Sequence, residues 1–165
     1  MKDIDQFKTK ETTKWKTSRG TTPTTKWKPG EVVEGCIVPK GWGEELIIEN
    51  NEMYCGKLLK FNAGCKFSMH YHMVKDETWY VNAGEFIYRW IDTETAEVKT
   101  IKLYPGDVVR HIPGQPHQLE ALTIGVVFEV STQHKDSDSY RVMKGDEQGR
   151  KTKDVVGRRH NLNII

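Results

Sequence analysis

The stretch from Gly64 to Gly84 decides the fold, and it reads GCKFSMHYHMVKDETWYVNAG. His70 and His72 lie two positions apart, so on a β-strand both imidazoles point to the same face. Glu77 follows five residues after His72, far enough for the chain to bend and return a carboxylate to the same place. His117 could add a third imidazole from a later strand. Three nitrogens and one oxygen suit Zn, Fe(II), Mn, Co or Ni and leave positions for water or substrate.

The sequence around this stretch predicts an all-β domain. From Cys36 to about Met143, short runs of Val, Ile, Tyr, Phe and Trp are separated by Gly, Pro, Asn and Asp, which is typical of a sandwich or barrel. No long segment has the periodicity of an amphipathic helix. The expected strands are Glu45–Glu49, Tyr54–Phe61, Lys66–His72, Thr78–Asn82, Glu85–Asp92, Val98–Leu103, Val108–Ile112, His117–Ala121 and Val126–Ser131.

Two spacings in the sequence resemble the two motifs of the cupin family. The segment from Gly64 to Gly84 matches the first motif without a gap, through its two end glycines, His70, His72 and Glu77. The segment from Gly106 to His117 is similar to the second motif. The resemblance implies an all-β antiparallel barrel of the jelly-roll type with a metal site near its mouth.

The cupin resemblance also implies the ligands of one divalent metal ion, which could be Zn, Mn, Fe, Co or Ni. These ligands are His70, His72, Glu77 and His117. The second motif departs from the family pattern at Ile112, where Pro is usual, and at Ala121, where Asn is usual. Neither position supplies a ligand, so the departures concern the shape of a loop and one structural hydrogen bond.

A narrower resemblance covers about residues 38 to 150. The segments 40–43, 57–77 and 128–150 look like the cupin part of type II phosphomannose isomerases, bifunctional enzymes that also carry mannose-1-phosphate guanylyltransferase activity. The sequence departs from that branch at His70, where Gln is usual, and at Lys75, where Arg is usual. We do not expect the nucleotidyltransferase half in a sequence of 165 residues.

The narrower resemblance implies a metal-dependent enzyme that acts on a sugar phosphate, most simply by aldose–ketose isomerisation of the mannose-6-phosphate type. In that reaction a base moves a proton between adjacent carbons of the open-chain sugar. The residues assigned to catalysis are Lys75, Glu120 and Arg141, and those assigned to substrate binding are Lys57, Trp79 and Arg141. His111 and Glu85 are alternatives for the base, because the sequence does not fix the register of their strands.

Two other classes of function remain open from the sequence. Iron-dependent cupin dioxygenases also use three histidines and one glutamate, and His70 in place of Gln favours that reading. A non-catalytic module that binds a metal or a carbohydrate is the third class. The context of Trp42, Lys57, Ser68 and Arg141 favours the sugar branch.

The composition divides the chain into three parts: a polar arm at residues 1–30 rich in Thr and Lys, the barrel at residues 31–145, and a basic tail at residues 146–165. The arm contains the string TTKWK twice, at residues 12–16 and 24–28. The two tryptophans could stack on a nucleic acid or a partner. We favour the simpler interpretation, in which they anchor the arm to its own barrel or to a second subunit.

Charge and hydropathy limit the classes of binding partner and the cellular location that we expect. The chain has 25 Lys and Arg against 23 Asp and Glu, so it lacks the basic excess of a nucleic-acid-binding protein. No apolar run is long enough to span a membrane, and the first residues do not resemble a signal peptide. The three cysteines lack the C-x-x-C spacing of a metal or redox motif. We expect a cytoplasmic homodimer that binds a small molecule.

Overall fold

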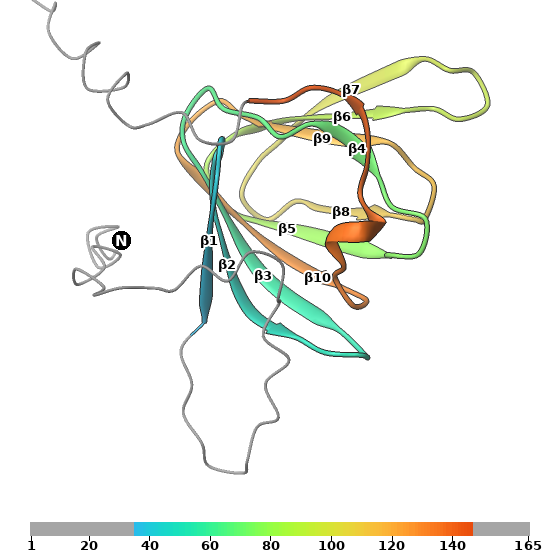
Figure 1. Ribbon diagram of the computed structural model, residues 1–165. Coiled ribbons are helices and arrows are strands. Elements are labelled where there is room, and N and C mark those ends of the chain that lie inside the picture. The colour runs from blue at the N-terminus through green and yellow to red at the C-terminus, as the bar shows by residue number, and fades with distance from the viewer. Residues whose placement is uncertain (1–34, 147–165) are drawn as a thin grey trace, which may run out of the picture.

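The computed structural model describes residues 35–146 (Figure 1). Within that range β-strands joined by turns and loops make up the fold, and the one helical element is a 3₁₀ turn, Asp136–Asp138. The expected arm at residues 1–30 lies outside the described residues, as does all but the first residue of the expected tail, so both stay predictions. No helix in the described range has the length and hydropathy needed to cross a membrane.

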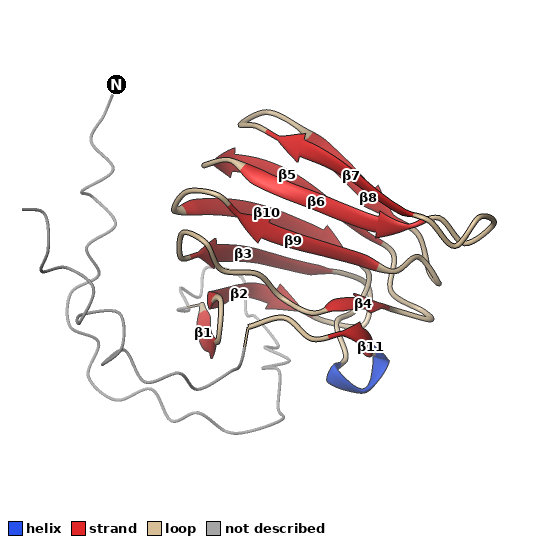
Figure 2. Ribbon diagram, turned by 90° about the horizontal axis from the view of Figure 1, so that it is seen from above, coloured by secondary structure: helices blue, strands red, loops and turns tan. Residues whose placement is uncertain are grey.

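Two antiparallel sheets face each other: Figure 1 shows one above the other, and in Figure 2, which is seen from above, their strands overlap. The six-stranded sheet has the order β1 (Cys36–Lys40), β2 (Gly43–Asn50), β3 (Cys55–Phe61), β10 (Gly125–Ser131), β5 (Glu77–Ala83) and β8 (Val108–His111). The five-stranded sheet has the order β11 (Tyr140–Met143), β4 (Met69–Tyr71), β9 (His117–Ala121), β6 (Phe86–Ile91) and β7 (Val98–Leu103). This architecture confirms the all-β antiparallel barrel that the sequence predicts.

The strands differ from the sequence prediction mainly at the sheet edges. The expected strands are all present as β2 to β10, whereas β1 and β11 were not expected. β1 contains Pro39, which lacks a backbone N–H and is tolerated because β1 is an edge strand. All residues of β11 are exposed, so this strand has no inward face that would require alternating apolar and polar residues in the sequence. β4 is shorter than expected and ends at Tyr71, which leaves His72 just beyond it.

The interior of the barrel is apolar at one end and charged at the other. Leu59, Val127 and Val81 are in register on β3, β10 and β5, and all three are buried in the hydrophobic core. At the next inward position toward the start of β3 and the end of β10, Lys57 pairs in register with Glu129. These two residues are only 2% and 3% exposed. Side chains two apart on a strand share a face, so these charges point into the same interior as the aliphatic residues.

The glycines of the two motifs occupy positions that side chains disfavour. Gly84, which connects β5 to β6, has φ +90°, and a Cβ there would lie 2.6 Å from the Cα of Gly125 and 2.8 Å from the carbonyl oxygen of Ile124. Gly106 has φ +99°, but a Cβ there would meet no atom within 4 Å. The first position therefore needs glycine for both conformation and space, and the second for conformation alone.

We expect Gly84→Ala to lower the free energy of unfolding by about 1–3 kcal/mol more than Gly106→Ala, because both variants bear the backbone strain but only the first adds a clash. Urea unfolding of the two variants measures the difference. Equal losses of stability would show that the close approach of Gly125 relaxes at little cost.

Candidate metal centre

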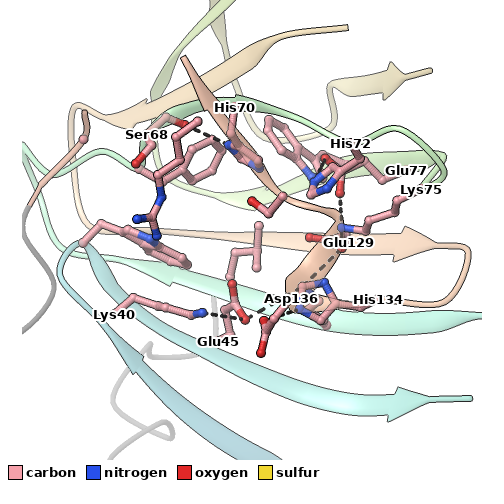
Figure 3. Close-up of a pocket in the computed structure, with 18 of the residues that line it drawn as sticks. Lys40, Glu45, Ser68, His70, His72, Lys75, Glu77, Glu129, His134 and Asp136 are labelled. Atoms are coloured by element: carbon pink, nitrogen blue, oxygen red, sulfur yellow. Dashed lines mark hydrogen bonds and ion pairs between the residues drawn. The ribbon is translucent and has the colours of Figure 1, made fainter. Parts of the chain in front are cut away.

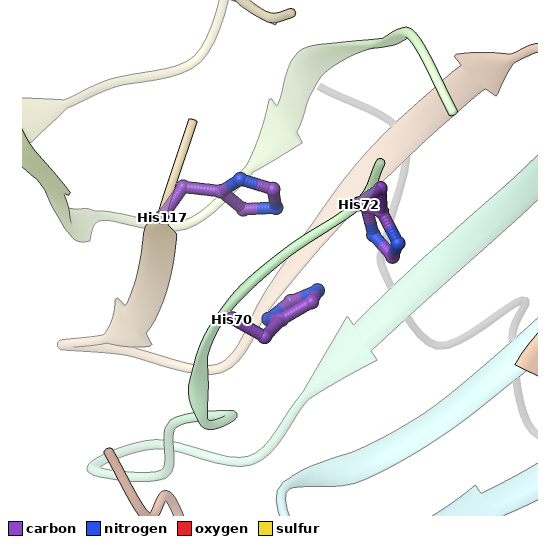
Figure 4. A group of neighbouring side chains, drawn as sticks. All are labelled: His70, His72 and His117. Atoms are coloured by element: carbon purple, nitrogen blue, oxygen red, sulfur yellow. The ribbon is translucent and has the colours of Figure 1, made fainter. Parts of the chain in front are cut away.

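The fold brings the four expected metal ligands together across the two sheets. His70 lies on β4 and is in register with His117, the first residue of β9. His72 follows β4, and Glu77 begins β5 in the opposite sheet. Figure 4 shows the three imidazoles turned toward one another. Their ligand atoms all lie within 4.8 Å of one another, so this group could hold a metal ion.

Each of the three imidazoles is oriented by a backbone carbonyl. The Nδ1 of each ring lies within hydrogen-bond distance of one carbonyl oxygen: Ser68 for His70 at 2.8 Å, Gln115 for His117 at 2.9 Å, and Asp138 for His72. A carbonyl oxygen only accepts, so each Nδ1 must carry the proton and each Nε2 keeps its lone pair. Metal-binding histidines are commonly held in this way by the nitrogen remote from the metal.

Glu77 adds an oxygen to this group of nitrogens. Its Oε1 lies 2.8 Å from Nε2 of His117 and 3.9 Å from Nε2 of His72. Within residues 35–146, neither Glu77 Oε1 nor His117 Nε2 has a partner with hydrogen-bond geometry. Two buried atoms that both offer lone pairs are stabilised by a shared cation, so these residues fit a divalent metal with nitrogen and oxygen ligands.

The protonation states also suit a metal. Burial by itself raises the pKa of Glu77, but the ammonium of Lys75 and the nearby imidazoles outweigh burial and hold the pKa well below its usual value. Burial, helped by His117, lowers the pKa of His70 to about 3. Burial likewise lowers the pKa of His72. Near neutral pH the carboxylate is therefore charged and these imidazoles are neutral, which are the forms that bind metals.

Lys75 supports the site electrostatically. It is 3% exposed, and its ammonium contacts the carboxylates of Glu77 and Glu129. Burial alone would lower the pKa of Lys75, but the two carboxylates outweigh it and raise the pKa. A lysine that stays protonated cannot accept a proton. These contacts argue against the role of general base that the sequence suggested for Lys75.

The other predicted catalytic residues are divided between the inside and the outside of the barrel. Glu120 lies on the face of β9 opposite His117, where its carboxylate accepts a hydrogen bond from Arg89 at 2.7 Å. Glu85 pairs with Lys102 at a solvent-exposed position. The structure does not bring either glutamate to the site. Arg141, by contrast, lies on β11 in register with His70.

The ligand cluster opens into a cavity of about 770 Å³, part of which is drawn in Figure 3. His70, His72 and Glu77 line one side of the cavity, and the predicted substrate-binding residues Lys57 and Trp79 also line it. Its charged lining residues are Lys40, Glu45, Lys57, Lys75, Glu77, Glu129, Asp136, Arg141, Lys144 and Asp146. A wall of this kind suits a polar, charged small molecule.

Trp79 and Lys57 line the cavity but are almost completely buried. Trp79 is 2% exposed, and its ring packs against His111 with centroids 4.0 Å apart. Lys57 is also 2% exposed, and its ammonium lies 3.5 Å from Glu129 and 3.8 Å from Glu45. Their predicted role in substrate binding stays a proposal.

Opposite charges alternate along one wall of the cavity. Starting from Glu77, the row continues through Lys75, Glu129, Lys57 and Glu45, and it ends at Lys40, which lies 3.5 Å from Glu45. Sequence reasoning missed Glu45 and Glu129. The available signal was a charged residue at an inward position of a strand, such as Glu129 between Val127 and Ser131.

His134 is a further cavity residue that the sequence did not reveal. Its Nδ1 accepts a hydrogen bond from Lys57 at 3.3 Å, and its Nε2 donates to Asp136 at 3.2 Å. The side chain is 12% exposed. Burial, together with the charge of Lys57, lowers the pKa of His134 to about 4, so this imidazole is neutral near neutral pH.

Asp138, in the 3₁₀ turn, fixes the loop that joins the metal residues. Its carboxylate accepts hydrogen bonds from the backbone N–H groups of Met73, Val74 and Lys75 at 2.8, 3.1 and 3.0 Å. Its own carbonyl accepts from His72. Burial raises the pKa of Asp138, but the three amides together with His72 outweigh burial and lower the pKa. Asp138 thus fixes both the orientation of the His72 imidazole and the backbone of the loop that follows it.

Two antiparallel sheets with a histidine and glutamate cluster at one end of their interior define a cupin barrel, and solved structures with this fold support the assignment. The capsular polysaccharide assembling protein CapF from Staphylococcus aureus matches with a TM-score of 0.59 and 15% identity, over 68% of this chain and 33% of that chain. Oxalate decarboxylase from Bacillus subtilis matches with a TM-score of 0.57 and 16% identity, over 66% and 30%. KdgF from Halomonas sp. matches with a TM-score of 0.50 and 21% identity, over 57% and 81%.

At these identities the likeness shows the fold alone. The chain spans about a third of the length of the CapF and oxalate decarboxylase chains. No protein-family profile matches the sequence, and no curated protein does. The cupin resemblance seen in the sequence is therefore supported by the fold, whereas the narrower resemblance to phosphomannose isomerases stays a prediction.

We expect His72→Ala to weaken the binding of Zn²⁺ or Co²⁺ by at least about 10-fold, because it removes an oriented Nε2 from the cluster. His134→Gln is the matched control, since it removes an imidazole from the same cavity but not from the cluster. Competition with a chromophoric chelator measures both affinities. Full metal affinity in His72→Ala would place the metal site elsewhere.

We expect His134 to make unfolding sensitive to acid. Its pKa is about 4 in the folded state and about 6.5 in the unfolded state, so its contribution to stability is complete above about pH 6.5 and is lost as the pH falls toward 4. Between pH 7 and pH 5, metal-free wild type should lose about 1–2 kcal/mol more unfolding free energy than His134→Gln. Parallel losses, measured by urea unfolding in the presence of chelator, would contradict this assignment.

Proposed function

We propose that this protein is a metal-dependent cupin enzyme that acts on a sugar phosphate, most simply as an aldose–ketose isomerase of the mannose-6-phosphate type. The observation that carries the proposal is the position of the candidate metal centre on the wall of a cavity that also contains uncommitted cations. A metal alone would suit many reactions. A metal beside free positive charge suits an anionic substrate with hydroxyl and carbonyl oxygens.

The uncommitted cations are Arg141 and Lys144. Both line the cavity, and within the described part of the chain neither forms an ion pair, whereas Lys40, Lys57 and Lys75 all do. Arg141 is in register with His70 on the neighbouring strand, so its backbone lies next to the metal cluster. We infer that Arg141 and Lys144 hold the phosphate while the sugar extends toward the imidazoles.

A divalent metal bound by His70, His72, Glu77 and His117 would polarise the carbonyl and hydroxyl oxygens of the open-chain sugar. Lys75 would keep Glu77 ionised, and the Asp138 carbonyl would keep His72 aimed at the metal. The base must be unprotonated at neutral pH. This requirement favours Glu129 and His134, whose pKa values are both lowered, over Lys75.

Three imidazoles with one carboxylate also suit iron, so a cupin dioxygenase is the second candidate, supported by His70 in place of the glutamine of the isomerase branch. A metal- or carbohydrate-binding module is the third. CapF is a protein of capsular polysaccharide assembly, which makes carbohydrate chemistry a precedent for this fold, although the low identity does not choose among the three. The homodimer and the cytoplasmic location also stay predictions.

The test is an isomerisation assay on full-length protein reloaded with Zn²⁺, Mn²⁺, Co²⁺ or Fe²⁺, with mannose 6-phosphate and unphosphorylated mannose as substrates. We expect turnover of the phosphate ester alone. Arg141→Ala should raise KM at least about 10-fold and change kcat less, because it removes a charge-assisted contact to the phosphate. Arg110→Ala is the control, since Arg110 is exposed and pairs with Asp76 outside the cavity.

Other results would redirect the assignment. A fully loaded protein that isomerises no sugar phosphate contradicts the isomerase proposal. Oxygen consumption by the iron form would then favour the dioxygenase, and binding of metal and sugar without any turnover would favour the binding module.

A further inference from the structure

His111 is a buried imidazole that the four-ligand scheme leaves out. It is the last residue of β8 and is in register with Glu77 on β5. Its side chain is 1% exposed, although its neighbours Val108 and Arg110 face solvent. Side chains alternate along a strand, so the alternation turns His111 into the barrel beside the proposed metal centre.

Neither ring nitrogen of His111 has a hydrogen-bond partner among the described residues. A neutral imidazole carries one N–H and one lone pair, and each destabilises the fold when it is buried without a hydrogen-bond partner. The surrounding rings are Trp79 at 4.0 Å, His117 at 4.2 Å and Tyr88 at 5.2 Å between centroids. An apolar side chain would fill this aromatic pocket without that cost, so packing alone does not account for a histidine here.

The unsatisfied nitrogens lie beside two other unsatisfied atoms. Nδ1 of His111 is 3.8 Å from Oε1 of Glu77, and that oxygen is 2.8 Å from Nε2 of His117. The ligand atoms of Glu77, His111 and His117 all lie within 4.8 Å of one another, as do those of His70, His72 and His117. The two groups share His117. His70 and His72 line the cavity, whereas His111 does not.

We propose that His111 is a direct ligand of the divalent metal, together with Glu77 and His117, on the side of the cluster away from the cavity. This inference rests on the metal centre of the proposed function, and it adds a protein ligand that the motif spacing does not contain. Five donors then surround the ion: four imidazoles and one carboxylate. The donor set favours a borderline cation such as Zn²⁺, Co²⁺ or Fe²⁺ over Mg²⁺ or Ca²⁺.

The experiment compares His111→Leu with wild type in the full-length protein, using Co²⁺ as a visible probe. We expect His111→Leu to lower the Co²⁺ affinity at least about 10-fold and to change the d–d absorption spectrum, because the coordination sphere loses an imidazole. Without metal, the same variant should unfold at an equal or higher urea concentration than wild type, because it removes two buried polar atoms that lack partners. Weaker metal binding without loss of stability is the signature of a ligand.

Tyr88→Phe is the matched control for packing, because it removes one hydroxyl and keeps the ring that contacts the His111 ring. It should leave the Co²⁺ spectrum and affinity unchanged. X-ray absorption of the Zn²⁺ form of wild type gives a second measurement that needs no variant, and it should count four imidazoles.

The outcomes separate the two proposals. An unchanged Co²⁺ affinity and spectrum in His111→Leu, or three imidazoles in the Zn²⁺ form, overturns the role of His111 and leaves the metal centre standing. Wild type that binds none of these metals overturns the metal centre itself, and His111 with it. If His111→Leu does not fold, the imidazole count decides.

Discussion

The ion pair between Lys75 and Glu77 is the interaction on which the rest of the site depends. Glu77 is 2% exposed, and a carboxylate removed from water to that degree stays charged only if a cation or several donors compensate it. The ammonium of Lys75 supplies that compensation from two residues away. Because Lys75 is equally buried, it needs further negative charge, and Glu129 provides it. Each buried charge thus requires the next.

This requirement explains why the barrel interior has two unlike halves. On β3 the inward positions are Cys55, Lys57, Leu59 and Phe61, so one strand passes from the charged half to the apolar half within a few residues. Removal of Lys75 would leave the Glu77 carboxylate buried without its cation, which costs far more than loss of an exposed ion pair. Charged side chains therefore occupy interior positions that apolar side chains could fill. The apolar half of the interior, around Phe61 and Phe86, is rich in aromatic rings.

The sequence predicted the metal ligands of the site better than the other charged and titratable residues of the cavity. Strand alternation placed His70 and His72 on one face, whereas Glu77 and His117 were assigned as their co-ligands through the resemblance to the two cupin motifs. Alternation marks Glu129 as an inward charge but does not reveal its partner Lys75, and it gives no signal for His134, whose partner Lys57 is also far away along the chain. Glu120 illustrates the limit of local reasoning: its place near the second motif suggested a base, but a shift of one position along a strand turns a side chain to the opposite face. His111 was an alternative for the catalytic base, and only the register of β5 and β8 places it beside Glu77.

The Asp138 turn has a mechanical consequence. The strand that follows this turn, β11, contains Arg141 and pairs with β4. Asp138 itself forms hydrogen bonds with the His72 ring and with the loop that ends at Glu77. The segment from Asp138 to Arg141, which would bind the phosphate under the proposed function, is therefore the segment that orients the His72 imidazole. Under the proposed function, a displacement of this short segment would alter both the phosphate contact and the orientation of the His72 ring.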